Sequence, residues 1–247
     1  MRPVRLVFLL SVASSLALAI WACTKTTEDY AAEVDRNAER DVVLKTLQET
    51  DPTFYGQIRD RAAGRLAAGE SEAEVLEAMQ AEMRAYGVRQ APYVAAAPGG
   101  AVVEVMQAEK ALIEHLQATD VDTCAQFAMA GLPAGYQADA RTKPLIDRAA
   151  TARLVAGQSG RASPVTREDP GQADFVAIYE TMVAGGVDEA LGQQFFGTGL
   201  MSAPPRTQCD VTAAFYSAVV AQPPARAEAV SAFIIKTVAE QMAPAGG

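Results

Sequence analysis

The residues that could do chemistry are few, and histidine is the first to consider. His115 is the only histidine in the 247 residues, so a metal site built from several histidines cannot form. A Ser-His-Asp triad would depend on His115 alone. On the helix predicted over Ala101–Thr119, His115 lies roughly 120° from the centre of the apolar face, on the solvent side. We therefore predict no metal site, no cofactor and no catalytic residue.

Glu109 is a carboxylate in the middle of an apolar helix face. Val105, Met106, Leu112 and Ile113 surround it on the predicted helix. A buried carboxylate is costly unless it is paired, hydrogen-bonded or protonated. We expect a structural role, in an ion pair with an arginine of a neighbouring helix or at the rim of the core. The alternative is a chemically active acid.

Two of the three cysteines form a candidate disulfide. Cys124 and Cys209 each lie on the apolar face of a predicted helix. In an oxidising compartment we expect them to be bridged, closing a loop of about 85 residues. In the chain-entropy model such a bridge stabilises the fold by about 4 kcal/mol. The alternative is two buried free thiols, since cysteine is often a core residue.

The third cysteine, Cys23, ends an apolar segment at the N-terminus. Two arginines precede residues 6–22, which carry no charge, and this order is typical of a secretory signal. Ile20, Ala22 and Cys23 resemble the signal box of bacterial lipoproteins, which has an aliphatic residue, two small residues and then cysteine. Trp21 departs from that box, because its position is normally small.

The resemblance implies that Cys23 becomes the lipidated N-terminus. It also implies the outer membrane, because Thr24 rather than aspartate follows the cysteine. Two alternatives stay open. Residues 6–22 could span a bilayer uncut, as an inner-membrane anchor, or cleavage after Ala19 would release the protein. All three place the domain in the cell envelope, facing the periplasm.

A second unusual segment combines large apolar residues with glycines and is followed by two prolines. Its apolar members are Phe195, Phe196, Leu200 and Met201. Apolar residues in a turn-rich segment suit contacts with a partner or with lipid. These four residues are a candidate partner loop. More often, however, residues of this kind fold back as a lid on the core.

The elements that position these residues are predicted to be helical. Alanine, a strong helix former, occupies 50 of the 247 positions, and strand-type alternation is nearly absent. Helix starts are marked by Asp51-Pro52 and by the capping box Ser71-x-x-Glu74. The sequence predicts an all-α fold, an irregular bundle of about nine short-to-medium helices with one disulfide.

The chain divides into three predicted regions. Residues 1–22 are a signal peptide or membrane anchor, residues 23–41 a polar tether or an extended helix, and residues 42–247 a single α-helical domain. Within the domain, a helix over Pro144–Ala156 is followed by a polar loop at Gln158–Arg167. This loop could divide two subdomains, but a Cys124–Cys209 bridge would tie across it.

Charge limits the partners. Without residues 1–22 the chain has 19 Lys and Arg against 30 Asp and Glu, a net charge of −11. An acidic domain repels phosphate backbones, so we expect no nucleic-acid partner, and membrane contact only through the N-terminal lipid or anchor. We expect an envelope lipoprotein that acts as a protein-binding accessory subunit or inhibitor. The alternative is a carboxylate-dependent cell-wall hydrolase.

Overall fold

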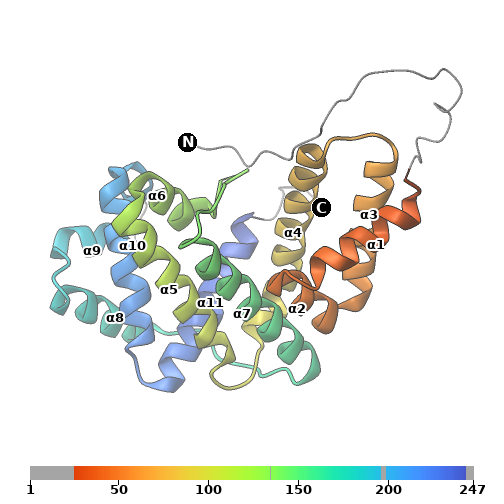
Figure 1. Cartoon of the computed structure of the whole chain (residues 1–247). Helices are drawn as coiled ribbons and strands as arrows, with labels where there is room; N and C mark the ends of the chain where they lie inside the picture. Colours follow the sequence, from red (N-terminus) through yellow and green to blue (C-terminus); the bar gives the residue numbers. More distant parts are fainter. Residues whose placement is uncertain (1–24, 134, 196–198, 243–247) are drawn as a thin grey trace, which may run out of the picture.

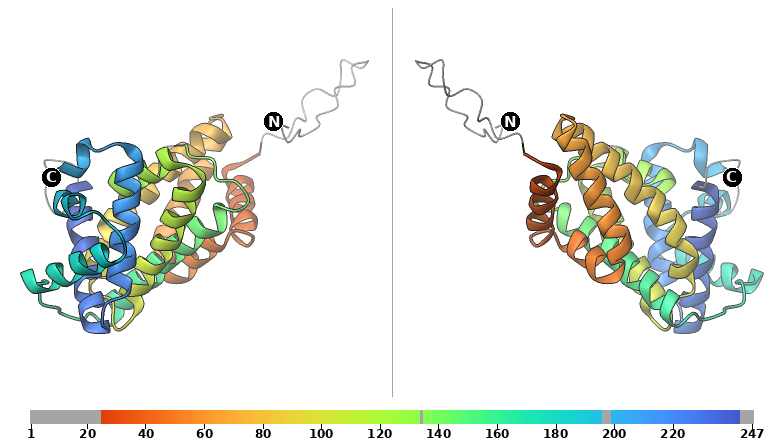
Figure 2. Two further views of the ribbon diagram at one scale, coloured as in Figure 1. Left: turned by 90° about the vertical axis from the view of Figure 1, so that its left-hand side faces the viewer. Right: turned by 90° about the vertical axis from the view of Figure 1, so that its right-hand side faces the viewer.

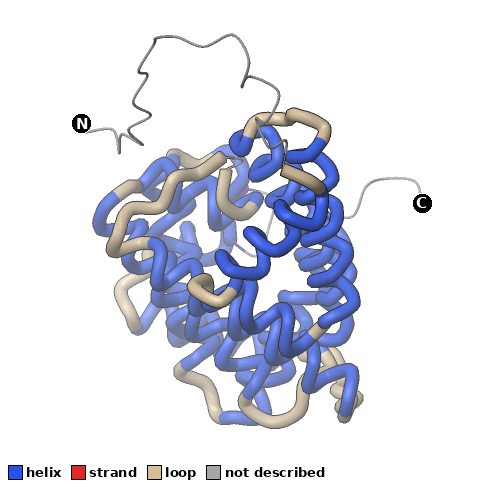
Figure 3. Tube along the Cα trace, turned by 45° about the vertical axis from the view of Figure 1, so that its right-hand side comes forward, coloured by secondary structure: helices blue, strands red, loops and turns tan. Residues whose placement is uncertain are grey.

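The computed structural model describes residues 25–133, 135–195 and 199–242, and within them it contains no strand (Figures 1 and 3). The all-α prediction is confirmed. The described residues form eleven α-helices and one 3-10 helix: α1 (Thr27–Ala38), α2 (Val42–Thr50), α3 (Pro52–Ala67), α4 (Glu72–Ala95), α5 (Ala101–Thr119), α6 (Val121–Ala130), α7 (Lys143–Ala162), α8 (Gln172–Ala184), α9 (Glu189–Phe195), η1 (Gly199–Ser202), α10 (Pro205–Val220) and α11 (Pro224–Met242). The count exceeds about nine partly because residues 23–41, predicted to be a polar tether or an extended helix, contain α1.

The N-terminal helices start where the sequence signals predict. The side chain of Asp51 accepts a hydrogen bond from the Phe54 amide at 3.0 Å, and Pro52 is the first residue of α3. Ser71 and Glu74 exchange the two hydrogen bonds of a capping box at the start of α4. Helix α1 packs against α3, where the Tyr55 hydroxyl donates to Asp35 at 2.7 Å.

Helix α5 is the centre of the bundle. It packs against α6, α7, α10 and α11, and its apolar face is fully buried, with Val105, Met106, Leu112 and Ile113 at most 1% exposed. The N-terminal helices α1–α3 and the C-terminal helices α8–α10 lie on opposite sides of it (Figures 1 and 2). Among the described helices none has the length and apolar character needed to cross a membrane.

Cys124 of α6 and Cys209 of α10 are joined by the predicted disulfide, with their Cα atoms 5.5 Å apart. Both residues are completely buried, in a cluster with Leu112, Ile113 and Leu116 of α5. The bridge therefore lies in the core and fastens α6 and α10 around the end of α5.

The predicted polar loop at 158–167 is partly wrong, because α7 continues through Gly157 and Gly160 to Ala162. Gly160 is buried against the backbone of α4, where a side chain would overlap the carbonyl oxygen of Tyr93. This close approach of two helices compensates the low helix propensity of glycine. The chain after α7 is also fastened, since Arg167 donates to the carbonyls of Ala95 and Ala97 at 3.0 and 2.6 Å.

Gly160→Ala is therefore expected to lower the free energy of unfolding by about 3 kcal/mol, because a Cβ there would also lie 3.0 Å from the Ala97 nitrogen and α4 would have to move. Gly157→Ala is the matched control. Its Cβ would meet only side-chain atoms, at 3.6 Å or more, and alanine favours the helix by about 1 kcal/mol. Urea unfolding followed by circular dichroism measures both variants. Equal stabilities would contradict the proposed backbone contact.

Candidate functional site

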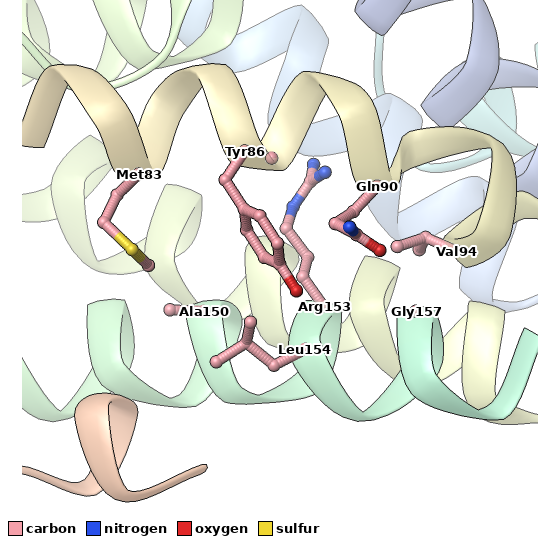
Figure 4. A pocket seen from close by; sticks show the side chains of 9 residues that line it. Met83, Tyr86, Gln90, Val94, Ala150, Arg153, Leu154 and Gly157 are labelled. Atoms are coloured by element: carbon pink, nitrogen blue, oxygen red, sulfur yellow. The ribbon is translucent and has the colours of Figure 1, made fainter. Parts of the chain in front are cut away.

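A pocket of about 110 Å³ opens between α4 and α7, and we call it the α4–α7 pocket. Its lining is mostly apolar and comes from the facing sides of the two helices: Met83, Tyr86, Gly87, Gln90 and Val94 of α4 with Ala150, Arg153, Leu154 and Gly157 of α7 (Figure 4). The pocket exists because residues with little or no side chain occur where the helices face each other. Apart from its chain neighbours and the backbone of its own helix turn, Gly87 has no atom within 4 Å of the place where a Cβ would be.

Arg153 connects this pocket to the core. Its Nε donates to the Glu109 Oε1 at 2.5 Å, and its Nη2 pairs with the same oxygen. Tyr216 of α10 donates its hydroxyl to the Glu109 Oε2 at 3.1 Å. Glu109 is 4% exposed, whereas the side chain of Arg153 is 38% exposed. Both carboxylate oxygens of Glu109 are thus engaged, in the arrangement expected of a structural carboxylate on a buried helix face.

The surroundings of the Glu109 carboxylate perturb its two partners. Burial and the negative charge of Glu109 raise the pKa of Tyr216 well above its ordinary value. Burial is the largest single influence on Arg153 and acts to lower its pKa, but the charge of Glu109, the neighbouring Tyr216 and the hydrogen bond to Glu109 together outweigh burial, and the pKa of the guanidinium is raised. Tyr216 therefore stays a neutral donor and Arg153 a cation at any physiological pH.

A second polar group adjoins the pocket residues Tyr86 and Gln90. Arg161 of α7 donates through Nη1 to the Gln90 Oε1 at 2.8 Å and to the Asp51 Oδ2 at 3.1 Å. Tyr86 donates its hydroxyl to the same Asp51 oxygen at 3.0 Å. Its pKa is raised, chiefly by burial, with Arg161 acting against the rise and Asp51 adding to it. Asp51 thus caps α3 and also links α2, α4 and α7.

A shallower groove of about 490 Å³ lies beside α2, α5 and α7. Glu104 and Asp147 both line it. Glu104 pairs with Arg148 at 2.7 Å, and Asp147 pairs with Lys143 at 2.7 Å. Val42 and Val155 add exposed apolar side chains to its rim, at 50% and 44%. The groove thus presents two carboxylates, each neutralised by a neighbouring cation.

The residues of the candidate partner loop differ in their exposure. Leu200 is 7% exposed and packs in a core cluster with Val211, whereas Met201 is 72% exposed. Phe195 ends α9, and its side chain and all of Phe196 lie outside the described residues. Cys23 lies outside them as well. The described part of this segment therefore offers Met201 alone as an exposed contact.

His115 is half-buried, although the helix face placed it toward solvent. Its Nε2 lies 3.0 Å from the hydroxyl of Thr142, which is 3% exposed. The chain that leads into α7 covers this side of α5, and the periodicity of a single helix cannot predict such a contact with a distant segment. Within the described ranges, no group of three or more His, Cys, Asp or Glu residues is placed to hold a metal ion.

The sequence reasoning missed the residues that form the α4–α7 pocket. The available signal was the pair of glycines, Gly87 and Gly157, inside helical stretches, because glycine there costs stability unless it serves packing. Gly87 lies inside α4, which continues to Ala95.

In comparisons with known proteins, no family model, no curated protein and no solved structure matches this chain.

Proposed function

We propose that this chain is an envelope lipoprotein, tethered through Cys23, that binds another protein as an accessory subunit or an inhibitor. The buried Cys124–Cys209 disulfide supports the exported location, because such bridges form and persist in oxidising compartments. The basic and apolar residues before Cys23 support the lipid attachment.

The observation that carries the binding role is the α4–α7 pocket. At about 110 Å³ it is smaller than the several hundred Å³ typical of small-molecule and cofactor sites. It is, however, of the size of one large aliphatic side chain, and single side chains anchored in such pockets dominate many protein interfaces. Glu109, which pairs with the pocket residue Arg153, also accepts from Tyr216, so both of its oxygens are occupied as those of a structural group would be.

Mass spectrometry of the mature protein tests the tether. We expect a chain that begins at Cys23 and carries the added mass of a lipid. Replacing Cys23 by serine should leave the protein unlipidated. The variant should then either leave the detergent-soluble membrane fraction or keep its signal segment uncut. A mature chain that starts at Met1, or at Ile20 without lipid, contradicts the lipoprotein proposal.

Site-specific photo-cross-linking in the native envelope tests the binding role. A photoreactive residue replaces Arg84, which is exposed on α4 beside the pocket residue Met83, and in separate variants Met201 or Asp60. We expect one discrete adduct at Arg84 and none at Asp60, an exposed control on α3. An adduct at Met201 alone would move the binding surface to the candidate partner loop. Absence of adducts at both positions contradicts a protein-binding role.

The alternative is a carboxylate-dependent cell-wall hydrolase, for which the groove with Glu104 and Asp147 is the relevant feature. Two carboxyl groups that flank a substrate are what glycoside hydrolysis requires. Release of glycan fragments by the wild type, abolished in a Glu104→Gln variant of unchanged stability, would favour this alternative. We expect no release by either protein.

A further inference from the structure

We propose that the α4–α7 pocket receives one aliphatic side chain of a partner polypeptide together with a backbone carbonyl of the same segment. This inference rests on the proposed binding function and specifies the chemistry of the partner.

The size and lining of the pocket select the side chain. An apolar cavity of about 150 Å³ accommodates benzene. The 110 Å³ here therefore accommodates a branched or linear group of about four carbons, as in leucine, isoleucine or methionine. Met83, Val94 and Leu154 provide aliphatic walls, and the ring of Tyr86 provides a flat one (Figure 4). An alanine would leave most of this space unfilled, and the indole of tryptophan would exceed it.

Two hydrogen-bond donors of the lining have no protein partner in the part of the chain that the structure describes. Arg153 directs Nε and Nη2 to Glu109, which leaves Nη1 without a partner among the described residues. Gln90 accepts from Arg161 through its Oε1, and its Nε2 has no partner in the described part of the chain. In Figure 4 the guanidinium of Arg153 projects between the side chains of Tyr86 and Gln90. A ligand that enters here meets donors and therefore needs an acceptor.

The charge balance around the pocket selects a neutral acceptor. Arg153 is paired with Glu109, and Arg161 is paired with Asp51, so the two cations and the two carboxylates cancel. A carboxylate ligand would add an uncompensated negative charge close to Glu109. An ammonium group would lie near two arginines and would find the carboxylates of Glu109 and Asp51 already paired with them. A backbone carbonyl is a neutral acceptor that lies within a few bonds of a side chain, and for this reason we infer a peptide segment and not a fatty acid or an amine.

The methyl group of Met83 is the reporter for a direct test. The full chain, disulfide-bonded and in detergent, is labelled with ¹³C-methyl methionine, and the Met83 signal is assigned with a Met83→Leu variant. The probes are N-acetyl-leucine N-methylamide and its alanine and tryptophan analogues. We expect the leucine probe to shift the Met83 signal, with a dissociation constant of about 1–10 mM. The alanine and tryptophan probes should bind about tenfold more weakly or not at all.

A second pair of probes tests the acceptor. Isovaleramide and isovalerate share one carbon skeleton, but one is neutral and the other anionic. We expect the amide to shift Met83 at concentrations about tenfold lower than the anion. Tighter binding of isovalerate would overturn the peptide assignment in favour of a small carboxylate. Gln90→Glu keeps an acceptor for Arg161 but removes the donor, and it should weaken the leucine probe several-fold. An unchanged affinity would overturn the role of Gln90.

Filling the pocket provides the control for location. Gly87→Leu places a side chain in the open space beside Gly87 and should abolish the shift. Gly64→Leu is the matched variant, since Gly64 is an exposed helical glycine of α3 with equally open surroundings outside the pocket. It should leave the shift intact. A Met83 signal unmoved by the leucine probe, while the cross-link at Arg84 forms, would overturn this inference and leave the binding function standing.

Discussion

Glu109→Gln is expected to lower the free energy of unfolding by about 3 kcal/mol, because the neutral amide leaves the charge of Arg153 uncompensated beside the core. Arg153 contacts Glu109 through two of its nitrogens, and Tyr216 donates to the second carboxylate oxygen. Urea unfolding of the disulfide-bonded protein, followed by circular dichroism, measures the loss. A Gln variant as stable as the wild type would contradict the structural role of Glu109.

Two further variants separate the ion pair from its surroundings. Tyr216→Phe removes only the 3.1 Å hydrogen bond and should cost about 1 kcal/mol. Glu109→Leu combined with Arg153→Met removes both charges together and should be closer to the wild type than Glu109→Leu alone, since no charge is left unpaired. If the double variant were less stable than Glu109→Leu alone, the ion pair would stabilise the fold by more than the mutual neutralisation of its two charges.

The same variants bear on catalysis. A chemically active Glu109 would give a Gln variant that folds as well as the wild type and loses an activity on cell-wall glycan. A stability loss without any glycan release by the wild type is the result expected here, because both carboxylate oxygens are engaged by protein donors.

Local sequence signals were sufficient for much of the fold. The apolar period of Ala101–Thr119 placed Glu109 among buried residues because neighbours on one helix face share one environment. Asp51, Ser71 and Glu74 marked helix starts because capping depends on residues three positions apart. The all-α class followed from the alanine content and from the near absence of alternating residues.

Features that depend on the packing of two helices were beyond the same reasoning. The glycines of α7 predicted a loop after Ala156, but the contact of Gly160 with α4 keeps the helix intact to Ala162. The partner of Glu109 could be stated only as an arginine, because the position of Arg153 depends on how α7 lies against α5. The α4–α7 pocket depends on the same kind of geometry, and no local pattern encodes it.

Removing the Cys124–Cys209 bridge is expected to lower the free energy of unfolding by about 4 kcal/mol, because the unfolded chain regains the freedom of a loop that the bridge closes across 85 positions. That loop includes α7 with Arg153, so loss of the bridge should also loosen the helix that lines the pocket.

Thermal melts with and without reductant measure this effect, and the Cys124→Ala, Cys209→Ala double variant is the control. The double variant should melt near the reduced wild type and should not respond to reductant. Alkylation of the denatured, unreduced protein should label neither Cys124 nor Cys209. Two labelled thiols in protein purified from an oxidising compartment would rule out the bridge.

Because both sulfurs are fully buried, reduction of the folded protein should be slow and should require transient opening of the cluster around Leu112 and Leu116. A fast loss of the bridge under native conditions would show that α6 and α10 separate more readily than their packing in the core indicates.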